Sequence, residues 1–137
     1  MRYLFPMNET PTRPYAEIRA ALLLAEELTP GAALPHLRMA ADALTRLIDE
    51  SLASTVLDEG TSLRGAGAAA GLTENAVGPR LARTTRLAGY ANDSGRVTAD
   101  AVRRAQYDAA AGVPAPDVVA ARPLRFKARR PPGDSDR

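Results

Sequence analysis

The 137-residue chain contains no cysteine and no tryptophan, and it has a single histidine, His36. Without cysteine, neither a disulfide framework nor a thiolate metal site can form, and His36 alone cannot build a histidine metal site. The spacing of Gly65, Gly67 and Gly71 does not match a nucleotide-binding fingerprint, because no strand precedes these glycines, and the only lysine, Lys127, is far from them. No catalytic arrangement of serine, histidine and carboxylate stands out either. We therefore expect no metal, no cofactor and no enzymatic activity.

Long apolar runs are also missing, since none approaches the ~18 residues that a membrane-spanning helix needs. The first residues, MRYLFPMNETP, are too short and polar for a signal peptide. These absences predict a cytoplasmic protein with no membrane partner. Aromatic residues make up only 4% of the chain, while 45% of it is apolar, chiefly alanine and leucine. This composition favours helices and predicts one all-α domain.

The formal net charge is only +2, but it is distributed unevenly. Residues 1–60 carry −4 and residues 105–119 carry −2, whereas residues 61–104 and 120–137 each carry +4. A genomic bias towards arginine explains why arginine outnumbers lysine, but it does not explain this segregation. Two positive segments favour a polyanionic partner.

Apolar periodicity and helix-ending residues predict five helices, at about 14–28, 35–59, 63–70, 74–88 and 99–111. In the second helix, apolar residues form one stripe, comprising Leu37, Ala41, Leu44, Ile48, Leu52 and Val56. In the last helix, the inward positions are Val102, Ala105 and Ala109. We divide the chain into an arm and helix at 1–34, a central domain at 35–112 and a basic, largely disordered tail at 113–137.

In the first helix, Leu23 and Leu24 widen the apolar face, which predicts deeper burial than a surface helix has. This segment is the candidate for homodimer formation. The alternative is that it extends the core of a single subunit.

The segment from Ser62 to Leu81 has the pattern of two short helices joined at a corner. It has a small residue where the helices would cross, a glycine able to adopt positive φ in the turn, an apolar residue after it, a capping residue and two inward apolar residues. These are, in order, Gly67, Gly71, Leu72, Thr73, Val77 and Leu81. Thr61 or Ser62 can cap the first of the two helices.

This segment resembles the helix-turn-helix modules common in actinobacterial regulators, which have the form S-W-x-x-I-G-x-x-L-G-V-S-x-Q-A. The matching positions are Ser62, Gly67, Gly71, Leu72, Thr73, Asn75 and Ala76. Leu63 replaces the aromatic residue, and Ala66 and Ala70 replace larger apolar ones. The resemblance covers about residues 38–89. It implies a three-helix DNA-binding core, to which this chain adds an N-terminal helix, a C-terminal helix and the basic tail.

If Val77 and Leu81 point inward, the second helix of the motif turns a different set of residues outward. In such motifs these residues meet the DNA major groove. We expect Asn75 to bond adenine, Arg80 and Arg83 to reach guanine or phosphate, and Arg64 and Arg86 to contact phosphate. Gly78 and Pro79 would let the backbone approach DNA, with a kink or loosened turn at Pro79. Thr73 is expected to cap the helix and can also lie near phosphate.

The tail residues Arg125, Lys127, Arg129 and Arg130 are candidates for a phosphate-binding arm, and a solvated tail is the alternative. The prediction is a sequence-specific binder of double-stranded DNA, associated with the nucleoid, acting as a small transcriptional regulator. A plasmid-partition, chromosome-end or nucleoid-associated protein would use the same physics. An adaptor that binds another protein through the helical corner is the alternative of a different class.

Overall fold

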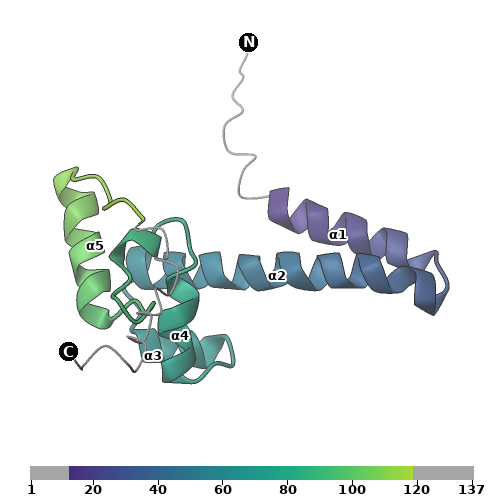
Figure 1. Ribbon diagram of the computed structural model, residues 1–137, viewed down its shortest axis with the longest axis horizontal. Coiled ribbons are helices and arrows are strands. Elements are labelled where there is room, and N and C mark those ends of the chain that lie inside the picture. The colour runs from purple at the N-terminus through teal and green to yellow at the C-terminus, as the bar shows by residue number, and fades with distance from the viewer. Residues whose placement is uncertain (1–12, 119–137) are drawn as a thin grey trace, which may run out of the picture.

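A computed structural model describes residues 13–118, and all regular secondary structure in this range is helical. Figure 1 shows a long central helix with a second helix along one end and the remaining helices gathered at the other. The elements are α1 (Arg13–Glu26), α2 (Pro30–Asp58), α3 (Leu63–Ala69), α4 (Glu74–Leu81), the 3₁₀ helix η2 (Ala88–Tyr90) and α5 (Ala99–Ala111). None of the helices within residues 13–118 is long and apolar enough to cross a bilayer.

The start of α2 corrects the sequence prediction, because the helix begins at Pro30 rather than near Pro35. Thr29 is its N-cap residue, and Pro30 takes the first helical position, where a missing N–H is not needed. Pro35 lies inside the helix. At this position it removes only the hydrogen bond that would reach the carbonyl of Gly31. The division expected between residues 34 and 35 therefore falls within a continuous helix.

Helices α1 and α2 form a hairpin that extends away from the other helices (Figure 1). Where α1 packs on α2, the buried residues are all small, namely Ala25, Ala33 and Ala40. Leu23 and Leu24 are 63% and 57% exposed, so the expectation that the first helix is deeply buried is wrong. The reason is that α1 packs only against the end of α2 that lies beyond the core.

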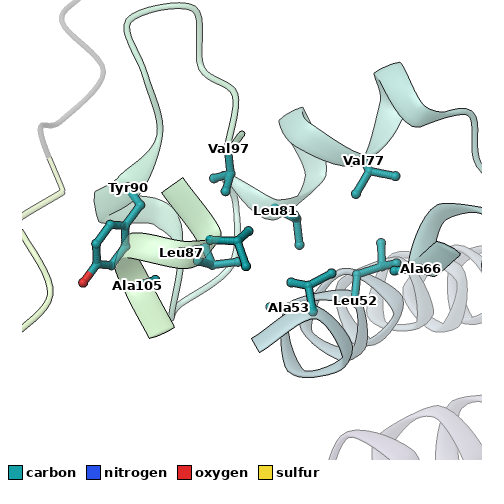
Figure 2. Close-up of a cluster of buried hydrophobic side chains, with 11 residues drawn as sticks. Leu52, Ala53, Ala66, Val77, Leu81, Leu87, Tyr90, Val97 and Ala105 are labelled. Atoms are coloured by element: carbon teal, nitrogen blue, oxygen red, sulfur yellow. The ribbon is translucent and has the colours of Figure 1, made fainter. Parts of the chain in front are cut away.

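The core lies where the C-terminal half of α2 meets α3, α4, η2 and α5 (Figure 2). Leu52 and Val56 supply the α2 contribution, as the apolar stripe predicts. The same stripe fails earlier in the helix, since Leu37 and Leu44 are exposed. The residues that complete the core come from α3, α4, η2, α5 and the connections before η2 and α5, and include Ala66, Val77, Leu81, Leu87, Tyr90, Val97, Val102 and Ala105.

Helix α3 is capped at both ends by local hydrogen bonds that the sequence predicts. The hydroxyl of Ser62 accepts a bond from the amide of Gly65 at 3.0 Å. At the other end Gly71 has φ +72°, and the amides of Leu72 and Gly71 bond the carbonyls of Gly67 and Ala68. This pair of bonds is a Schellman motif, which turns the chain sharply towards α4.

The second helix of the corner is shorter than predicted, because α4 ends at Leu81 rather than near Ala88. Beyond it the amides of Arg83 and Thr84 bond carbonyls only three residues back, and the buried hydroxyl of Thr84 donates to the carbonyl of Leu81 at 2.6 Å. The carbonyl of Gly78 also accepts from the distant amide of Val97 at 3.1 Å. Pro79, which cannot donate to the helix, precedes the end by two residues.

Helix α5 begins and ends as the sequence predicts, with the Thr98 hydroxyl accepting from the amide of Ala101 and Gly112 at φ +71°. Val102 and Ala105 are buried, whereas Ala109 is exposed, contrary to expectation. Tyr90 ties η2 to α5, because its hydroxyl donates to Asp108 at 2.8 Å and its ring lies beneath the Arg104 guanidinium. Burial first, and then this hydrogen bond, raise the pKa of Tyr90.

The close approach of α3 and α4 predicts a steric effect at position 67. A Cβ there would lie 2.6 Å from Cγ2 of Val77, closer than two carbon atoms can pack. Gly67→Ala should therefore lower the free energy of unfolding by about 1–2 kcal/mol, because overpacking outweighs the gain in helix propensity. Urea unfolding followed by circular dichroism measures the change.

Gly31→Ala is the matched control, since a Cβ there has nothing within 4 Å. It should leave stability unchanged or raise it by up to about 1 kcal/mol. Equal effects of the two substitutions would contradict the tight crossing at Gly67.

Candidate functional site

The exposed side of α4 is the candidate site. Val77 and Leu81 point into the core, as predicted, so the opposite side of the helix faces outward. Asn75 lies on that outer side and is exposed, Pro79 is half-buried there, and Arg83 is exposed just past the helix end. Asn75 and Pro79, four residues apart, therefore share one side of α4.

Thr73 is exposed at the N-cap position of α4, but its hydroxyl makes no capping hydrogen bond. The expectation that it caps the helix through its side chain is wrong, although its position is as predicted. The hydroxyl is consequently available to other partners at the start of α4. Arg64, in the first turn of α3, is also exposed.

Gly78 does not lie on the outer surface, contrary to expectation. It is buried, and a Cβ there would lie 3.2 Å from the carbonyl oxygen of Val97 and 3.5 Å from Cβ of Arg96. The absence of a side chain at Gly78 therefore admits another part of this chain. The sequence could not reveal this, because the segment that covers Gly78 lies 18 residues further along.

Arg80 is turned towards α2 rather than outward. Its Nη1 atom donates to Oδ1 of Asp49 at 3.0 Å, and the Asp49 side chain is only 7% exposed. A buried carboxylate needs such a partner, because burial without one costs several kcal/mol. Arg80 thus satisfies a charge inside the protein, and its expected contact with a base stays a prediction.

Arg86 also pairs with α2. Its two terminal nitrogens donate to the two oxygens of Asp58 at 2.8 and 2.9 Å, in a bidentate pair. These hydrogen bonds hold the pKa of the Asp58 carboxyl below its usual value and raise the pKa of Arg86. Arg86 was expected on the outer side of a longer helix, and it reaches Asp58 because α4 ends at Leu81.

A third α2 carboxylate completes this attachment, since Oε1 of Glu50 accepts from the amide of Thr85 at 3.0 Å and from its hydroxyl at 3.3 Å. The acidic side of α2 therefore fixes α4 and the turn that follows it. None of the ion pairs found within residues 13–118 involves Arg64, Arg83 or Arg96.

Arg96 is a site candidate that the sequence reasoning missed. The side chain of Asn92 accepts from the amides of Ser94 and Arg96, and Gly95 has φ +75°, which closes a tight loop. The bond from the amide of Val97 to Gly78 fastens this loop beside α4. Arg96 itself is exposed, and its Cβ lies 3.5 Å from where a Cβ of Gly78 would be. The sequence Asn-Asp-Ser-Gly indicates a turn, but it does not show that the turn packs beside α4, because that contact joins residues far apart in the sequence.

We call Asn75, Arg83 and Arg96 the α4 surface. The four tail candidates, Arg125, Lys127, Arg129 and Arg130, lie outside the described residues, as does the N-terminal arm. His36, which stands in α2, is half-buried and lines a groove between α1 and α2. Comparisons with protein-family models, curated proteins and solved structures return no match. The function is therefore argued from the residues alone.

The bidentate pair between Asp58 and Arg86 makes stability depend on pH in one direction. The pKa of Asp58 is lower in the folded protein than in the unfolded chain, so the stabilisation is present above about pH 4 and is lost as pH falls through the folded pKa. Asp58→Asn should destabilise the protein at neutral pH. The gap between wild type and variant should shrink below about pH 4.

Urea unfolding of both proteins at several pH values measures this gap. Asp93→Asn is the control, because no ion pair to Asp93 is found among residues 13–118. A constant gap from neutral to acid pH would show that the ion pair does not stabilise the fold.

Proposed function

We propose that this protein binds double-stranded DNA with sequence preference and acts as a small transcriptional regulator. In this proposal α3 and α4 form a helix-turn-helix, and the α4 surface lies in the major groove. The observation that carries the proposal is the contrast among the arginines. Arg80 and Arg86 are paired with carboxylates of α2, whereas the exposed Arg83 and Arg96 take part in none of the ion pairs found within residues 13–118.

The chemistry of the α4 surface suits DNA bases and phosphates. An asparagine amide can donate to N7 or accept from N6 of adenine in a paired contact, and arginine bonds guanine or phosphate in the same planar way. Asn75 lies in the first turn of α4, which is the part of a recognition helix that approaches base edges. Asn75 is therefore the proposed base-reading residue, with Arg83 beside the bases or phosphate.

The remaining contacts are assigned to the phosphate backbone. Arg96 lies at the edge of the α4 surface, and Arg64 and Thr73 stand near the helix N-termini of the corner. Amides at helix N-termini favour anions, which supports phosphate contacts near Thr73. Arg80 and Arg86 are assigned a positioning role, since they hold α4 and the following turn against α2. The tail arginines and Lys127 remain proposed phosphate contacts.

A fluorescence anisotropy titration of labelled DNA at several salt concentrations tests the proposal. Affinity should fall steeply with salt, because each phosphate contact releases a counterion. Arg83→Ala should weaken binding to a preferred site by about 1–3 kcal/mol, and Arg96→Ala should weaken binding to all DNA and reduce the salt slope by about one.

Arg38→Ala is the matched control, because it removes the same charge from α2 far from the α4 surface. It should leave affinity and salt slope close to wild type. Lack of binding to any genomic fragment at low salt would overturn the proposal. An equal loss of DNA affinity in Arg38→Ala and Arg83→Ala would show that binding is unspecific charge attraction, not recognition by the α4 surface.

A further inference from the structure

The hairpin of α1 and α2 lacks the core that its sequence could build. Where α1 packs on α2 the buried residues are three alanines, while seven leucines of α1, α2 and the turn between them are each more than 40% exposed. A helix pair whose buried residues are alanines buries little apolar area and gains little stability from it. The large side chains that would normally stabilise such a pair point elsewhere.

The exposed leucines of α2 follow a regular spacing. Leu34, Leu37, Ala41, Leu44 and Ile48 are separated by three, four, three and four residues. That spacing places them along one line of the helix, which we call the α2 seam, and it is the spacing by which helices pack into bundles and coiled coils. The seam is 64%, 43% and 47% exposed at Leu34, Leu37 and Leu44.

The α2 seam continues directly into the core of the protein. Ile48 is half-buried, and Leu52 and Val56 are covered by the helices that follow α2. One line of apolar residues is therefore covered at one end of α2 and uncovered at the other. This continuity indicates a stretch of helix suited to burial for which residues 13–118 supply no cover.

Helix α1 adds to the same surface with the same spacing. Tyr15, Ile18, Leu22 and Ala25 are separated by three, four and three residues. Ile18 and Ala25 are turned towards α2, whereas Tyr15 and Leu22 are 51% and 46% exposed. Both helices of the hairpin thus present large apolar side chains with bundle spacing.

We propose that a second copy of this chain covers the α2 seam, so that two hairpins form a four-helix bundle. The size of the surface fits a dimer. Five exposed large side chains offer on the order of 90 Å² each, or roughly 450 Å² of apolar surface per copy. With the polar rim that interfaces carry, this corresponds to about 750 Å² per partner, close to the ~800 Å² of a stable interface.

The charges of the hairpin also suit contact with its own copy. Residues 13–47 contain four arginines and four carboxylates, so two hairpins do not repel each other. Arg19 and Glu26 follow Tyr15 and Leu22 by four residues each and therefore flank the exposed surface of α1. In a two-fold contact, if residue i of one copy meets residue j of the other, then j also meets i. Arg19 of one copy can therefore face Glu26 of the other.

The other side of the hairpin is distinct from the α2 seam. There Leu24 and Met39, together with His36, Asp42 and Arg46, line a groove of about 420 Å³. Met39 and Leu24 are 63% and 57% exposed, so this side provides matched control positions with similar exposure. Charged residues, Glu17, Asp42 and Arg46, are also among those that line this groove.

Sedimentation equilibrium of the full chain without DNA tests the proposal. Wild type should be a dimer, and Leu44→Glu should weaken dimerisation at least about tenfold, because a carboxylate would be buried in the contact. Met39→Glu introduces the same charge on the groove side and should remain a dimer. Circular dichroism checks that each variant keeps its helices.

A second measurement does not depend on a disruptive variant. Because the chain has no cysteine, Thr45→Cys gives a single attachment point for a spin label on α2. A dimer places two labels in one particle and gives a dipolar distance, whereas a monomer gives none. Adding excess unlabelled protein should remove the signal.

A monomeric wild type at all concentrations would overturn the proposal. So would dissociation in Met39→Glu together with an intact dimer in Leu44→Glu. If residues 1–12 cover the seam instead, the protein would be a monomer whose hairpin amides lose protection from hydrogen exchange when these residues are deleted. The proposal does not rest on DNA binding, and its failure would leave the proposed function untouched.

Discussion

The contact between Gly67 and Val77 is the constraint on which the arrangement of the core depends. Only a residue without a side chain lets α3 and α4 approach this closely, and the approach brings Val77 and Leu81 into contact with α2. The Schellman turn at Gly71 sets the direction of α4, but the crossing at Gly67 sets its distance. The orientation of the α4 surface follows from both.

Features that depend on neighbouring residues could be predicted from the sequence. The caps at Ser62 and Thr98, the left-handed turn at Gly71 and the inward positions of Val77 and Leu81 all follow from short-range spacing. The end of α4 could not be predicted, because it involves the contact of Gly78 with Val97. The prediction that the leucines of α1 are buried is wrong for a related reason. Periodicity identifies an apolar face of a helix but does not show which element covers it.

Only part of the candidate site could be predicted, because the rest depends on contacts between distant parts of the sequence. Asn75 lies on the outer side of α4 as helical geometry requires, and Arg83 is exposed just past the helix end. A count of charges, however, cannot show which arginines are neutralised within the fold. Asp49 and Asp58 of α2 bind Arg80 and Arg86, which are separated from them by 31 and 28 positions. Arg96 enters the site through a loop that packs on Gly78. The acidic α2 thus distinguishes Arg80 and Arg86, which it pairs, from Arg83 and Arg96, which take part in none of the ion pairs found within residues 13–118.

The central claim is that Asn75 and the exposed arginines read DNA sequence. Selection of bound fragments from random double-stranded DNA tests it most directly, with wild type and Asn75→Ala compared at the same salt concentration. Wild type should enrich a motif, and Asn75→Ala should lose preference at one or more adenine-containing positions of that motif. No enriched motif for wild type, or an identical motif for Asn75→Ala, would contradict it.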